Sequence, residues 1–181
     1  SKLPASGSPA DYFELTFHAE QGVPYHLWVR GRADADHYLN DSAHVQFSDS
    51  VNVSGTPIWR IGSSDSAIFS VQNGNGAPIA GWGWEDHGWA VLGPHVYFAT
   101  SGVHTVRISR REDGLSIDQI VLSPDRYLET SPGAGTNDST VLAESSGEQD
   151  PEPDPDPDPE PDPGSADEIV LYASEARIVG S

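Results

Sequence analysis

Residues 103–122 read VHTVRISRREDGLSIDQIVL and carry the clearest structural signal in the chain. Apolar and polar residues alternate in both halves, as in strands that bury one face. The pair Asp113-Gly114 between the halves tolerates the positive φ that a tight reversal needs. We therefore expect strands at 103–109 and 115–122, joined as a hairpin.

The same two-residue period recurs upstream of this stretch. It runs from Phe13 to Phe17, from Tyr25 to Val29 and from Val45 to Phe47. Further strands are expected at 57–61, 67–72 and 94–99, with turn-rich segments between them. About eight strands predict an all-β fold over residues 11–128, a jelly-roll type two-sheet β-sandwich.

The composition changes after the sandwich. Residues 129–166 contain few apolar residues, and prolines occupy every second position from Pro151 to Pro163, with Asp or Glu between them. Alternating prolines fix φ and remove amide donors, and like charges repel one another. The segment therefore predicts an acidic, extended, Pro-rich linker between modules.

Residues 167–181 follow this linker and contain the strand-like run Ile169-Val170-Leu171-Tyr172. We expect the run to be the opening strand of a following module. Two alternatives remain open. The strand folds back or docks into a neighbouring copy, where it would add to an open sheet edge, or the tail is disordered.

Charge and composition exclude several classes of function. The formal net charge is −19, so no basic patch is available to displace the counterions of nucleic-acid phosphates. The same charge disfavours anionic membrane surfaces. The chain has no Cys, which excludes thiol catalysis and a disulfide framework. We expect neither a nucleic acid nor a membrane as a partner.

The segment GWGWEDHGW, residues 81–89, holds three of the five tryptophans. Sugars stack their C–H patches on aromatic faces, and carboxylate or imidazole groups accept and donate hydrogen bonds to the hydroxyls. The intervening glycines allow a close approach to a ligand. The expected ligand-binding residues here are Trp82, Trp84, Glu85, Asp86, His87 and Trp89. The alternative is that the indoles cap one end of the core, as we expect of Trp28 and Trp59 in strand patterns.

A second polar cluster lies at residues 34–42, between two expected strands. Tyr38 and Asn40 are candidates for hydrogen bonds to a sugar, and the acidic residues are candidates for oxygen ligands of Ca²⁺. A solvated turn is the alternative interpretation.

Enzyme motifs are not evident. The seven histidines are scattered over different strands without a zinc spacing, and no Ser nucleophile elbow occurs. The acidic pairs Glu85/Asp86 and Glu112/Asp113 are sequence neighbours and not the opposed carboxylates of a glycosidase. The sequence therefore predicts a protein that is not an enzyme, with a catalytic domain of unrecognised type as the weakest alternative.

Residues 103–108 and 113–122 resemble the closing hairpin of malectin-like and galactose-binding-like sandwiches, including the carbohydrate-binding modules of families six and thirty-five. Residues 25–31 resemble the central strand of that family. The resemblance implies a secreted or cell-surface module attached to bacterial polysaccharide-degrading enzymes. Ser116 stands near the position where the family has a sugar-contacting Asn.

The resemblance also implies a structural calcium ion. Asp118 looks like the final-strand acidic residue that binds Ca²⁺ in such modules, and residues 172–176 resemble their opening strand, so that Glu175 would be a second metal ligand. Two functions follow. The leading hypothesis is a non-catalytic polysaccharide-binding module of a secreted multimodular bacterial protein. The alternative is a structural or adhesive repeat that contacts neighbouring modules of the same protein.

Overall fold

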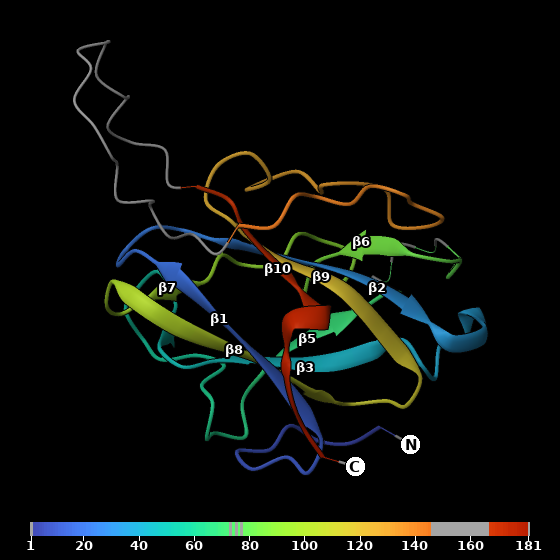
Figure 1. The fold of residues 1–181 in the computed structure, drawn as a ribbon, viewed down its shortest axis with the longest axis horizontal. Coiled ribbons are helices and arrows are strands. Elements are labelled where there is room, and N and C mark those ends of the chain that lie inside the picture. Colours follow the sequence, from blue (N-terminus) through green and yellow to red (C-terminus); the bar gives the residue numbers. More distant parts are fainter. Residues whose placement is uncertain (1, 73, 75, 77, 146–166, 181) are drawn as a thin grey trace.

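The computed structural model of the chain describes residues 2–72, 74, 76, 78–145 and 167–180. Within them two antiparallel sheets lie face to face and enclose an apolar core (Figure 1). This arrangement confirms the expected all-β sandwich. In the described part of the chain no helix is long and apolar enough to cross a membrane.

One sheet has five strands in the order β11-β1-β8-β3-β5. Its strands are β1 (Tyr12–Ala19), β3 (Ser42–Phe47), β5 (Ala67–Ser70), β8 (Gly102–Arg110) and β11 (Arg177–Val179). The longest pairing joins β1 to β8, from Tyr12 opposite Ser109 to Ala19 opposite Gly102.

The facing sheet has four strands in the order β10-β9-β2-β6. Its strands are β2 (His26–Ala33), β6 (Gly83–Glu85), β9 (Leu115–Ser123) and β10 (Ile169–Tyr172). The shorter elements are β4 (Ser50–Val51), β7 (Tyr97–Phe98) and the 3₁₀ turns η1 (Asp34–Asp36) and η2 (Ala173–Glu175). The expected strand at 57–61 is absent among the described residues, where Pro57 and Arg60 form only isolated bridges.

The expected hairpin of residues 103–122 is wrong. β8 pairs with β1 and β3, whereas β9 pairs with β2 and β10, so the two strands lie in opposite sheets. Gly114 does adopt a positive φ of 91°, but the turn carries the chain across the sandwich. The physical reason is visible in Ile120-Val121-Leu122, which is buried on both faces. Such a strand belongs inside a covered sheet.

The core lies between the sheets. Leu27, Ile120 and Leu122 of the four-stranded sheet and Phe47 and Val106 of the five-stranded sheet are all fully buried. The ring of Phe98 packs edge-on against Phe17 and Phe47, with centroid separations of 5.4 and 5.8 Å. Each edge-to-face pair adds to the stabilisation that burial alone provides.

A second apolar cluster lies on the outer face of the four-stranded sheet and consists of Trp28, Trp84, Val121 and Val170. Residues 129–145, which we call the covering segment, run over this face (orange in Figure 1). The covering segment belongs to the range expected to be a linker, and it instead packs on the sandwich through backbone hydrogen bonds. The remainder of that range, including the Pro/Asp run of 151–163, lies outside the described residues.

The C-terminal strand joins this same sandwich (red in Figure 1). β10 pairs with β9, which places Ile169 opposite Leu122 and Leu171 opposite Ile120. After η2, β11 pairs with β1, with Ile178 opposite Phe13. One short segment therefore supplies an edge strand to both sheets. This is the fold-back arrangement among the sequence alternatives, in place of the start of a following module.

Candidate functional site

The three indoles of the 81–89 segment have three different environments. Trp84 is 1% exposed and belongs to the outer apolar cluster. Its Nε1 donates to the Thr140 carbonyl at 3.2 Å, so the covering segment closes over it. The buried Trp28 is held in the same way, since its Nε1 donates to the Tyr127 carbonyl at 2.6 Å. Both indoles pack as structural residues.

Trp82 is half-buried and carries two cations on its ring. The guanidinium of Arg30 lies 5.0 Å and that of Arg32 lies 5.3 Å from the ring centroid. Such contacts are favourable because the ring face is electron-rich. Arg30 is itself fixed by Asp118 and by the Asp138 carbonyl, to which its Nη2 donates at 3.0 Å.

Trp89 is the exposed indole, with 62% of its surface accessible. It rests on the turn at Gly74, where a Cβ atom would come within 2.5 Å of the ring. Val91 and Leu92 beside it are 74% and 48% exposed. Ala90 holds a left-handed φ of 62°. Residues 89–92 therefore form a projecting apolar tip.

Asp86 organises the loop that carries this tip. Its carboxylate accepts hydrogen bonds from His26 Nε2 at 2.9 Å, from the Gly88 amide at 2.8 Å and from the Gly93 amide at 2.6 Å. Burial would raise the pKa of Asp86, but the bonds from His26 and the two amides outweigh it and lower the pKa. The loop from 86 to 93 is thus tied at both ends to one buried carboxylate.

His87 lies inside this loop. Its ring meets Trp59 edge-on at 4.8 Å, and Gly93 packs so closely that a Cβ there would come within 2.5 Å of Nε2. Burial lowers the pKa of His87 to about 4, so the ring is neutral at physiological pH. His87 therefore supports the loop from within.

A cleft of about 500 Å³ separates the 84–92 loop from the start of the covering segment. Its lining includes Trp28, Trp84, Glu85, Asp86, Val91, Leu92, Glu129, Thr130, Ser131 and Thr136. Gly135 allows the close fit, because a Cβ there would lie 2.6 Å from Glu85 Oε1. Carboxylates and hydroxyls thus converge beside the exposed apolar tip.

The second predicted cluster lies apart from this cleft. Tyr38 is 55% exposed and stacks on His37 at 4.7 Å, and Asn40 Nδ2 donates to the Asp34 carbonyl at 3.0 Å. The cluster contacts the aromatic segment where the Gly81 amide donates to Asp36 Oδ1 at 2.9 Å. Neither Tyr38 nor Asn40 lines the cleft.

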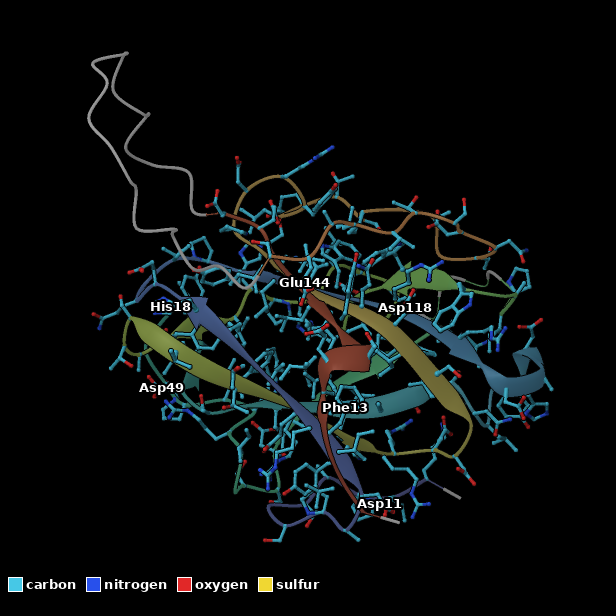
Figure 2. All side chains as sticks on the ribbon, in the orientation of Figure 1. Asp11, Phe13, His18, Asp49, Asp118 and Glu144 are labelled. Atoms are coloured by element: carbon cyan, nitrogen blue, oxygen red, sulfur yellow. The ribbon has the colours of Figure 1, made fainter. Side chains whose placement is uncertain are left out.

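The two expected calcium ligands have separate surroundings. Asp118 lies on β9 (Figure 2), and its carboxylate pairs with Arg30. Glu175 lines a different cleft of about 460 Å³, together with Glu14, Glu144 and Arg177, and Asp118 is not part of that lining. No group of three or more His, Asp or Glu side chains among the described residues is arranged to hold a metal ion. Asp118 therefore has an arginine partner in this arrangement and lies apart from the Glu175 cleft, and the calcium site stays a prediction.

A buried carboxyl pair escaped the sequence analysis. Asp41 and Glu112 are 3% and 4% exposed, and Glu112 Oε2 accepts from the Asp41 amide at 3.3 Å and from Ser42 Oγ at 2.5 Å. Burial and the hydrogen bond to Glu112 raise the pKa of Asp41 to about 6. Burial opposes the ionisation of Glu112, but hydrogen bonds from Asp41 and Ser42 and the charge of Lys2 lower its pKa to about 2. Because Asp41 and Glu112 are 71 positions apart in the sequence, no local motif predicts this pair.

Comparison of the chain with protein families, with curated proteins and with solved structures finds no match.

Proposed function

We propose that this protein is a non-catalytic carbohydrate-binding module, and that it acts outside the cell or on its surface. The observation that carries the proposal is the exposed apolar tip of residues 89–92, which presents the indole of Trp89 and lines a cleft of about 500 Å³ through Ala90, Val91 and Leu92. An apolar platform next to convergent polar groups is the combination that sugars need, because each ring has a C–H face and a rim of hydroxyls.

The polar groups of the cleft suit hydroxyl recognition. Glu85 and Glu129 supply carboxylates, while Thr130, Ser131 and Thr136 supply hydroxyls that both donate and accept. Negative charge in the cleft and in the whole chain would repel uronic acids and sulfated sugars. The proposed ligand is therefore a neutral or amino-sugar polysaccharide.

The environment of Asp86 supports a binding role over a catalytic one. Its carboxylate already accepts three hydrogen bonds from the protein and holds the loop in shape. Preorganised loops lower the entropy cost of binding. Secretion and attachment to an enzyme rest on the sequence resemblance alone, because residues 103–122 do not form the hairpin that the resemblance implies, and they belong to this proposal.

The experiment compares three variants on a panel of neutral, amino-sugar and acidic polysaccharides. Trp89→Ala should lose binding with an unchanged melting temperature, since the ring is exposed. Trp84→Ala should unfold more easily by about 3 kcal/mol, since the ring is buried. Tyr38→Ala, an exposed aromatic outside the cleft, should keep both properties. Binding that persists in Trp89→Ala would refute the assignment of this cleft.

A structural or adhesive repeat remains the second candidate. The observation that favours it is the C-terminal segment, in which β10 and β11 close both sheets at once. A strand that completes two sheets is a means of joining modules, and this role does not depend on sugar binding.

A further inference from the structure

The groove that receives the C-terminal strand is built for an extended peptide. On one side β9 offers its edge to β10, and on the other β1 offers its edge to β11. Without residues 169–179 both edges would carry unpaired backbone groups, which recruit further strands. Strand addition of this kind uses backbone bonds for affinity and alternate side chains for specificity.

The side chains of the strand match the groove at alternate positions. Ile169 and Leu171 enter the main core at 1% and 4% exposure, and Val170 enters the outer cluster at 3%. Arg177 Nη1 lies 3.5 Å from Glu14 Oε2, and the Tyr172 hydroxyl donates to the Leu142 carbonyl at 2.6 Å. The groove therefore recognises this particular sequence.

The chain leaves the covering segment at Ser145 and returns to the sandwich at Val170, and these two residues are paired. The Ser145 amide donates to the Val170 carbonyl at 2.9 Å, and the Val170 amide donates to the Ser145 carbonyl at 2.7 Å. Between them the sequence has seven prolines at alternate positions of 151–163 with acidic residues between. A Pro-rich run of this length spans about 40 Å when extended, at about 3.1 Å per residue. A run of that length would also allow the strand to reach the same groove of a neighbouring copy.

We propose that residues 168–179 also dock into the same groove of a second copy of this chain, so that copies are joined by reciprocal or serial strand exchange. The contacts in the exchanged state are those already described, because the donor strand and the groove are unchanged. Exchange then depends on protein concentration and on the stiffness of the connection. It does not require sugar binding, so either proposal can fail without the other.

The test uses the absence of cysteine in the chain. Glu14 and Arg177 face one another across the β1–β11 pair. One chain carries Glu14→Cys and the other carries Arg177→Cys, and the two are unfolded together, refolded at high concentration and oxidised. A disulfide-linked heterodimer should form several-fold more abundantly than in a control that pairs Glu14→Cys with Val53→Cys. Val53 is exposed and lies outside the β1–β11 pair. Yields equal to that control would overturn the proposal.

Two further sets of variants test the register of the docked strand and the stiffness of the spacer separately. The pair Tyr12→Cys and Val179→Cys tests the same register two positions further along the strands and serves if the first pair disturbs folding. Replacing the seven prolines of 151–163 with Gly converts the spacer into a flexible coil, which should lower the heterodimer yield and raise the monomer fraction in light scattering. An unchanged yield in the Gly variant would overturn the role given to the spacer.

Discussion

His26 and Asp86 form a buried pair, with 2.9 Å between the imidazole Nε2 and the carboxylate Oδ2. They come from β2 and from the loop after β6, and His26 is fully buried and stacks on Trp28 at 4.5 Å. The pair thus joins the central strand of the four-stranded sheet to the loop that carries Trp89.

Removing this carboxylate should loosen the loop. Asp86→Ala leaves His26 and two backbone amides without their acceptor, and the loss of one partner of a buried pair costs about 3 kcal/mol. We expect that loss in urea unfolding, together with faster proteolysis within 87–93. Glu129→Ala, at the exposed wall of the same cleft, is the matched control and should change neither. Equal stability of Asp86→Ala and the parent would contradict this role.

The Asp41–Glu112 pair predicts a pH dependence of stability. Asp41 has an ordinary pKa of 3.8 and a folded pKa of about 6, so its contribution to stability is complete below about pH 4 and is lost as the pH rises through 6. Glu112, with its pKa lowered from 4.5 to about 2, contributes fully only above its ordinary pKa, so its gain opposes the loss from Asp41 near pH 4 to 5 and is constant at higher pH. The melting temperature should therefore fall between pH 5 and 7.

Asp41→Asn is the variant that isolates this effect, because an amide cannot ionise. The melting temperature of Asp41→Asn minus that of the parent should increase as the pH rises from 4 to 7, by several degrees at pH 7. Asp113→Asn changes an exposed neighbour of Glu112 and should follow the parent. Parallel curves for Asp41→Asn and the parent would show that the pair does not share a proton.

The C-terminal strand should contribute strongly to stability. Leu171→Ala removes a side chain that is 4% exposed and contacts the core, which costs about 3 kcal/mol. Ile178→Ala, at 79% exposure in β11, should cost less than about 0.5 kcal/mol. Guanidinium unfolding of both variants measures the difference. Equal losses would mean that the strand is not seated as described.

Asp118 distinguishes an arginine partner from a calcium ion. If Arg30 is its partner, Asp118→Ala should cost about 2 kcal/mol in the presence and in the absence of EDTA. An EDTA-induced drop in the melting temperature of the parent that disappears in Asp118→Ala would support the calcium site expected from the sequence.

The two-residue period was sufficient to predict the sheets but not their pairing. Alternation in 103–109 and 115–122 predicted two strands, and the Asp113-Gly114 turn suggested that they pair. Turn chemistry fixes the local φ, whereas the choice between one sheet and two depends on what covers the outer face of β9. That cover is the segment 129–145, whose polar composition gave no sign that it would pack.

The same cover explains what could be predicted of the site. The 81–89 segment is singled out for its indoles, and the structure brings Glu85 and Asp86 to the cleft and leaves Trp89 exposed, next to Ala90 of the cleft lining. Trp84 is buried because Thr140 and its neighbours lie above it, and their contacts are made by backbone carbonyls. Backbone partners leave no trace in side-chain pattern, so neither the burial of Trp84 nor the wall at Glu129 could be predicted.

The late position of β10 along the chain has a consequence for biosynthesis. Forty-five residues separate the end of β9 at Ser123 from Ile169, and a ribosome adding roughly 5–20 residues per second needs roughly 2–9 s to make them. Throughout that interval Ile120 and Leu122 have no β10 beside them, and the nascent sandwich is open at both sheets. The protein therefore completes its fold only after the acidic spacer has been translated, and until then a nascent chain on the same message presents an open groove to its neighbours.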